Sequence, residues 1–223
     1  MKEHVDAYRP RPKQFFIASE GFPFIAAGLG FLLLFAVAGL SFLVLIFIFL
    51  VTFTAFFFRN PGRVTPLNGD LIIAPADGKV IRVESGVTAP HLEKPATKVS
   101  IFMSVMNVHV NRFPIKAAVK GVFYHPGKFF VASLDKASEH NERNAVVLAD
   151  EKNREIEMVQ IAGLVARRIV CYVRDGDCLD AGERFGLIRF GSRVDLYITS
   201  EVEVAVREGQ KVVAGETVIG RFL

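Results

Sequence analysis

The dipeptide Gly191-Ser192 is the part of this sequence best suited to chemistry. A serine hydroxyl becomes a useful nucleophile when a base removes its proton, and a carboxylate commonly orients that base. His109 and Asp77 provide one candidate of each type. The nearest carbonyl group that the Ser192 hydroxyl can reach along the chain belongs to Gly191. These residues therefore indicate a serine that attacks the protein's own backbone.

Each of these residues also has an ordinary structural explanation. Gly191-Ser192 and Asp77-Gly78 are typical of turns, because glycine adopts the backbone conformations that tight turns need. His109 lies between two valines, a position that is typical of a strand residue with a hydrogen-bonded side chain. Taken singly, these residues predict no more than a membrane-tethered β domain.

Longer segments, taken in order along the chain, favour the chemical interpretation. They resemble the short form of phosphatidylserine decarboxylase, a pyruvoyl-dependent enzyme that is made as a self-cleaving proenzyme. The similar segments are 57–61 (FFRNP), 75–78 (PADG), 101–104 (IFMS), 107–112 (NVHVNR), 133–138 (SLDKAS), 141–144 (NERN), 160–169 (QIAGLVARRI) and 184–192 (RFGLIRFGS). The resemblance covers nearly the whole chain and is most specific from Arg59 onward.

The resemblance implies a reaction and a cofactor. Amino-acid decarboxylation needs an electron sink, and a carbonyl group that forms a Schiff base with the substrate amine is one. Here the carbonyl would be a pyruvoyl group made from Ser192, after its hydroxyl attacks Gly191 and the chain is cut into residues 1–191 and 192–223, which stay associated. The implied activity converts phosphatidylserine to phosphatidylethanolamine and CO2. His109 is the implied base, and Asp77 would orient it.

One position departs from the pattern of the longer relatives, which carry two histidines three residues apart in this region. The first position here is His109, but the second is Arg112. Whether His109 serves self-cleavage, decarboxylation or both therefore stays open. His125 is the reserve candidate.

Binding of the substrate head group calls for cations, because the group carries a phosphate and a carboxylate. The candidates for substrate binding are Arg167, Arg168, Lys128, His125 and Asn144. For the three cationic residues, a solvated basic edge or contact with membrane phosphates is an equal alternative.

An uncharged run of 38 residues separates Glu20 from Arg59. As one helix it would span about 57 Å at about 1.5 Å per residue, whereas a bilayer core is about 30 Å thick. The run therefore predicts two short helices with a turn at Gly39-Leu40-Ser41, either spanning or re-entrant. A cleaved signal peptide fits poorly, because the run is too long and no clear cleavage site follows it.

The predicted organisation follows from this run. Residues 1–23 form a basic arm, residues 24–58 form the membrane segment, and residues 59–223 form the catalytic domain. Because basic residues flank both ends of the run, both flanks are expected on the cytoplasmic side of the cell membrane.

The catalytic domain reads as short β-strands. Segments 71–74, 79–83, 99–103, 118–123, 145–148 and 155–159 have strand patterns, and 87–97 is predicted as a loop. Segments 173–186 and 206–220 share a rhythm of strand, glycine turn and strand, as in lipoyl- and biotinyl-carrier domains. We therefore expect a mainly β fold, a compact barrel-like or barrel-sandwich-hybrid domain.

The same rhythm suggests an alternative function, a membrane-anchored carrier or adaptor of the lipoyl or biotinyl type without catalysis. Such a carrier needs a modifiable lysine at a hairpin tip. Lys211 follows one such turn but lacks the expected flanking residues, which favours the enzyme.

Composition excludes other classes. The net charge is +4, which suits a surface against anionic lipid, and no nucleic-acid-binding signature accompanies it. Cys171 and Cys178 match no zinc-binding spacing, and no metal site is expected. The oligomeric state, including a homo-oligomer, stays open.

Overall fold

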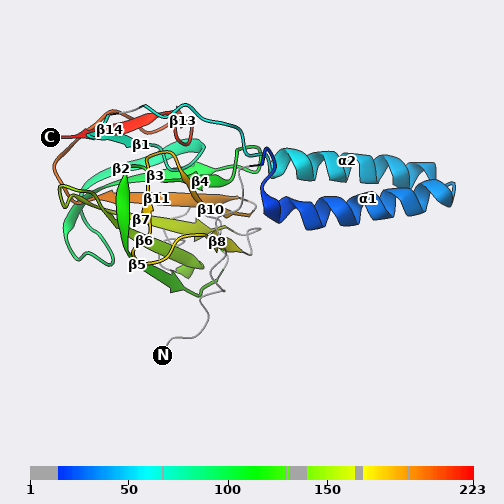
Figure 1. The fold of residues 1–223 in the computed structure, drawn as a ribbon, viewed down its shortest axis with the longest axis horizontal. Coiled ribbons are helices and arrows are strands. Elements are labelled where there is room, and N and C mark those ends of the chain that lie inside the picture. The colour runs from blue at the N-terminus through cyan, green and yellow to red at the C-terminus, as the bar shows by residue number, and fades with distance from the viewer. Residues whose placement is uncertain (1–14, 67, 129, 131–139, 164–167, 190) are drawn as a thin grey trace. The chain divides into compact units, whose positions relative to one another are not determined.

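The computed structural model describes residues 15–66, 68–128, 130, 140–163, 168–189 and 191–223. The chain divides into a helical unit, residues 12–62, and a β unit that begins at Arg63 (Figure 1). Each unit is described by itself.

The helical unit is an antiparallel pair of apolar helices. A short 3-10 turn (Ser19–Gly21) leads into α1 (Phe22–Val37), and α2 (Ser41–Phe57) follows after a three-residue break. Gly39 makes the break possible, since its φ of 71° lies in the left-handed region that favours glycine. The segment Ser19–Val37 is long and apolar enough to cross a membrane, whereas α2 is shorter. The predicted pair of helices and their turn are present.

The helices pack through aromatic and small residues. The Phe47 ring on α2 lies 5.3 Å from the rings of both Phe31 and Phe35 on α1, measured between centroids. At Gly28 the helices approach closely, because an added Cβ would lie 2.6 Å from a methyl carbon of Val51. Most other large apolar side chains of the pair are exposed.

The β unit contains one large sheet of eight strands. In order across the large sheet these are β13 (Lys211–Val212), β2 (Gly78–Thr88), β3 (Pro95–Met103), β11 (Ser192–Ile198), β7 (Glu155–Ala162), β6 (Arg143–Ala149), β5 (Ala117–His125) and β9 (Cys178–Leu179) (Figure 1). Neighbouring strands are antiparallel.

Two sheets of three strands complete the unit. One consists of β4 (Val110–Arg112), β10 (Arg184–Ile188) and β8 (Ile169–Cys171), and the other of β1 (Leu71–Ile73), β14 (Val218–Phe222) and β12 (Val202–Val204). The prediction of a mainly β fold is confirmed. The sheets are not closed into a barrel, however, because the large sheet ends at the two-residue edge strands β13 and β9.

Strand β11 lies in the middle of the large sheet and connects its two cores. Val194, Leu196 and Ile198 point into the main core, which also contains side chains from β10, and we call this side the inner face. Tyr197 points to the outer face, where it joins a second cluster under the β2–β3 turn. Side chains alternate along a strand, so Ser192 shares the inner face with Val194.

Candidate active site

Gly191 and Ser192 lie where the chain enters β11. Ser192 pairs with Met103 on β3 and with Ala162 on β7, and its side chain is fully buried. Gly191 has a φ of 67°, a backbone conformation that side-chain-bearing residues rarely adopt. The peptide bond between them therefore joins a turn that requires glycine to a strand held on both sides.

His109 is a titratable side chain that the structure brings to Gly191. Its Nδ1 lies 3.0 Å from the Asn107 carbonyl oxygen, which accepts a hydrogen bond, so Nδ1 carries the proton. The unprotonated Nε2 then accepts a hydrogen bond from the Gly191 amide at 3.4 Å. The backbone holds the histidine in place as well, since the His109 carbonyl accepts the Ile188 amide of β10. His109 is almost fully buried.

Asp77 has different partners from those that the sequence suggested. Its carboxylate accepts two hydrogen bonds from Arg63, at 2.9 and 3.1 Å, and one from the Ala214 amide at 2.7 Å. His109 Nδ1 donates its orienting hydrogen bond to the Asn107 carbonyl oxygen. Asp77 therefore ties the turn before β2 to the C-terminal part of the chain.

Arg112, which replaces the second histidine of the longer relatives, belongs to the surroundings of Asp77. Its Nη1 donates to the Gly182 carbonyl at 2.8 Å. Burial, with the charges of Arg63 and Arg184, holds the pKa of Arg112 below its ordinary value, while Asp77 and Glu216 act in the opposite direction. Arginine stays charged at physiological pH, so this position supplies no base.

Two of the predicted cations lie on segments that border the Ser192 end of β11. The Arg168 carbonyl accepts the Arg189 amide, two residues before Gly191. Lys128 is exposed, and its carbonyl accepts the amide of Glu142, whose own carbonyl accepts the Ala162 amide. Arg167 lies outside the described residues.

His125 belongs to another cluster. Its Nε2 lies 2.9 Å from Nε2 of His91, and His91 Nδ1 donates to the buried carboxylate of Glu157 at 2.6 Å. Burial, followed by the charges of Arg143 and His91, lowers the pKa of His125, and Glu157 opposes this shift. The cluster lies beside the outer-face residues of the large sheet, on the opposite side from Ser192.

Asn144 is buried on the inner face and leads to residues that the sequence analysis missed. Its Nδ2 donates to Gln160 Oε1 at 3.1 Å, and Gln160 Nε2 donates to Asn111 Oδ1 at 2.8 Å. Met103 contacts both Asn111 and the Ser192 hydroxyl. The one available signal was the presence of polar amides at positions where strand alternation predicts core residues.

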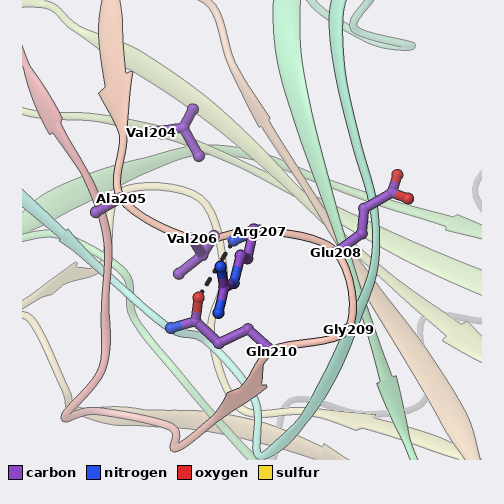
Figure 2. A pocket seen from close by; sticks show the side chains of 7 residues that line it. All are labelled: Val204, Ala205, Val206, Arg207, Glu208, Gly209 and Gln210. Carbon is purple, nitrogen blue, oxygen red and sulfur yellow. Dashed lines mark hydrogen bonds between the residues drawn. The ribbon is translucent and has the colours of Figure 1, made fainter.

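Two hollows of the described surface lie away from these residues. One of about 770 Å³ is lined by residues 204–210, where the Arg207 amide donates to Gln210 Oε1 at 3.2 Å (Figure 2). None of the predicted site residues lines it. Among the described residues, no group of three or more His, Cys, Asp or Glu side chains has the arrangement of a metal site.

Comparisons of this chain with known proteins all indicate the same family. A family model described as phosphatidylserine decarboxylase matches residues 50–220. The chain is 50% identical over 208 residues to a phosphatidylserine decarboxylase proenzyme of Syntrophus aciditrophicus, covering 93% of this chain and 98% of the relative. It is 48% identical over 204 residues to one of Syntrophotalea carbinolica, covering 92% and 95%. It is 51% identical over 176 residues to one of Nitrobacter winogradskyi, covering 78% and 71%. This chain therefore belongs to the phosphatidylserine decarboxylase family of carboxy-lyases.

Proposed function

We propose that this protein is a self-processing decarboxylase that converts phosphatidylserine to phosphatidylethanolamine and CO2 with a pyruvoyl group made from Ser192. One observation carries the proposal. In a chain of a proenzyme family, the amide of a left-handed glycine, directly before the serine, donates a hydrogen bond to the unprotonated nitrogen of a buried histidine. The family match does not favour the carrier alternative.

Self-cleavage begins with attack of Ser192 Oγ on the Gly191 carbonyl carbon, with His109 Nε2 taking the hydroxyl proton. For this step the O–H bond of Ser192 must rotate from Met103 toward His109, while Oγ keeps its position. The amide then becomes an ester, and loss of the Cα proton of residue 192 breaks the Cβ–Oγ bond. Oγ leaves within the new carboxylate of Gly191. Addition of water and release of ammonia give the pyruvoyl group at the start of the second fragment.

The surroundings of Ser192 fit such a group. The position is buried and excludes bulk water, which limits side reactions of a reactive carbonyl. When formed, the pyruvoyl carbonyl supplies the electron sink for the charge left by loss of CO2. His109 is then the proposed proton donor to the product, because its Nε2 is hydrogen-bonded to the amide of Gly191, the neighbour of residue 192. The division of its work between the two reactions stays a prediction, as does an assisting role of Asp77.

The two fragments, residues 1–191 and 192–223, are proposed to stay associated. In the second fragment, β11 is paired along its length with β3 on one side and β7 on the other. Strand β14 pairs with β1, and the Ala214 amide donates to Asp77. Strands with partners on both sides cannot leave without breaking the large sheet.

Membrane attachment is assigned to residues 24–58, with residues 59–223 as the catalytic domain on the cytoplasmic side and residues 1–23 as a basic arm. The apolar surface of α1 and α2 supports the attachment. Basic flanks at both ends of the run support the orientation. Spanning and re-entrant arrangements both agree with these observations, and a homo-oligomer stays open.

Binding of the substrate anions is assigned to Lys128 and Arg168, with Arg167 as a third candidate. Support comes from the hydrogen bonds that connect the segments of Lys128 and Arg168 to the Ser192 end of β11. His125 is a weaker candidate, since it is engaged with His91 near the outer face. Asn144 faces the protein interior, where it bonds Gln160.

The test uses phosphatidylserine vesicles, the full chain and a Ser192→Ala variant. Wild-type protein should release CO2, and borohydride reduction in the presence of substrate should attach the substrate amine to the 192–223 fragment. Ser192→Ala should remain one chain and release no CO2. Decarboxylation by the uncleaved variant would refute the proposal.

A further inference from the structure

A continuous row of buried polar groups crosses the inner face of the large sheet and ends at Ser192. Asn144 of β6 donates to Gln160 of β7, Gln160 donates to Asn111 of β4, and Asn111 Nδ2 donates to Met103 Sδ of β3 at 3.7 Å. Ser192 Oγ donates to the same sulfur at 3.4 Å. Five strands thus contribute one side chain each, and all are buried.

The burial of these polar side chains is unfavourable in free energy. Burial of an amide costs free energy unless its donors and acceptors are satisfied, and apolar side chains would pack here without that requirement. Val194 and Met158 occupy neighbouring inner positions and are ordinary core residues. The amides therefore do something other than fill space.

The hydrogen bonds of the row all run toward Met103, and the last of them are weak. Each amide donates with its nitrogen to the next side chain toward Met103, so the orientation of one amide determines that of the next. At Met103 both Asn111 and Ser192 meet a thioether sulfur, which is a poor acceptor. A hydroxyl held by such an acceptor has a defined direction, yet it can leave toward a base at little cost.

The neighbouring backbone is shaped to admit the row. At Gly186 of β10, an added Cβ would lie 3.2 Å from Gln160 Nε2 and 2.2 Å from the Val170 carbonyl oxygen. Glycine at this position lets β10 lie directly against the amide of Gln160. The packing thus holds Gln160 from the layer opposite the large sheet.

We propose that Asn111, Gln160 and Asn144 are positioning residues for self-cleavage, and that they act through Met103. The row holds the Met103 sulfur in one place, and the sulfur selects the Ser192 rotamer whose Oγ donates to it. A serine otherwise has three staggered rotamers to choose from. This inference rests on the proposed cleavage at Ser192.

The experiment measures the self-cleavage rate of the full chain by denaturing gel and intact mass. Asn111→Leu, Gln160→Met and Met103→Leu should each slow cleavage by about 10²-fold, the cost expected for a misplaced reacting group. Ser100→Ala, which removes a buried hydroxyl on the outer face of β3, is the matched control and should cleave at the wild-type rate. Thermal melting of each variant combined with Ser192→Ala reports its structural cost separately.

Two readouts separate positioning from a merely structural role. Combining Met103→Leu with Asn111→Leu should slow cleavage no further than the slower single variant, because both act through the same sulfur. Asn111→Asp is nearly isosteric but loses the donor toward Met103 when ionised. Its cleavage rate relative to that of the wild type at the same pH should therefore recover as the pH falls and the new carboxyl group is protonated, since the protonation of His109 affects both proteins alike.

The outcomes are distinct. Wild-type cleavage rates in the Asn111 and Gln160 variants, or fully multiplicative effects in the double variant, would overturn this inference. A ratio of the Asn111→Asp rate to the wild-type rate that does not change with pH would overturn it as well. If Ser192→Ala is itself processed, the proposed function fails instead, because cleavage then has another origin.

Discussion

The helical unit and the β unit use apolar residues in opposite ways. On α1 and α2, large side chains such as Leu33 and Phe42 are 65% and 74% exposed. In the β unit, residues of the same kind, such as Leu148 and Leu196, are fully buried. A helix satisfies its own backbone hydrogen bonds and can present apolar side chains to lipid, whereas strands need neighbours. The difference indicates that one unit is built for an apolar solvent and the other for water.

The chemistry follows the same division. Residues 21–58 include no charged side chain, whereas Ser192, His109 and the buried amide row all belong to the β unit. Attachment and catalysis are therefore expected to fail independently of each other.

The largest contrast should come from the same substitution in both units. Leu148→Arg places an unpaired charge in the β core and should cost more than about 4 kcal/mol, so that no folded protein accumulates. Leu33→Arg should cost about 2.5–3.5 kcal/mol of membrane insertion if this position lies at the centre of the bilayer. Flotation with vesicles measures membrane binding, and a denaturing gel measures how much protein accumulates and whether it is cleaved. Loss of self-cleavage in Leu33→Arg would break the division between the units.

Removal of the base should be the next largest effect. His109→Ala should slow self-cleavage by about 10²–10⁴-fold, the usual contribution of general acid–base catalysis. Vesicle flotation should be unchanged, because the substitution leaves the helical unit intact. If the variant is processed at the normal rate but fails to decarboxylate, the role of His109 is confined to the second reaction.

Asp77→Asn tests the connection between the two fragments. The variant keeps an acceptor for the Ala214 amide but loses the charge that pairs with Arg63. We expect a loss of about 1–3 kcal/mol, since the mostly buried Arg63 loses its shorter ion pair and keeps the longer one to Glu216, at 3.7 Å. The melting temperature should fall more in the processed protein than in the precursor, because in the precursor the covalent chain still holds residues 192–223. Equal losses in both forms would argue against the connecting role.

The smallest effect should be the pH dependence contributed by His125. Its folded-state pKa is lowered from the ordinary 6.5, so the unfolded chain binds the proton more readily. Its contribution to the free energy of unfolding should therefore decrease as the pH falls through 6.5 and become constant below the folded-state pKa. His125→Gln should remove this part of the dependence, which urea titrations between pH 5 and pH 8 can measure. An unchanged dependence of the free energy of unfolding on pH in the variant would contradict this contribution of His125.

The sequence predicted those features that depend on local pattern. The uncharged run predicted the two helices and the turn at Gly39, and short strand-like segments predicted strands such as β6 and β7. The predicted loop at 87–97 is shorter in the structure, because β2 continues to Thr88 and β3 begins at Pro95. The register between β2 and β3 shifts in this region, so the sequence here lacks the regular two-residue alternation by which a strand is recognised.

Contacts between distant residues were less predictable. Asp77 and Ala214 are 137 positions apart, and Asn111 and Gln160 are 49 apart. Such partners depend on the strand order and register of the sheets, which local propensity does not determine. The mainly β fold was confirmed, whereas the open form of the sheets could not be predicted from local pattern, since closure depends on how the edge strands pair.

Intact mass of the purified protein under denaturing conditions tests the central claim most directly. The account predicts two polypeptides, residues 1–191 and 192–223, with the second lighter by one ammonia than the same peptide with an N-terminal serine. A single chain of all 223 residues in an active preparation would contradict the account. So would a second fragment that retains serine at its N-terminus.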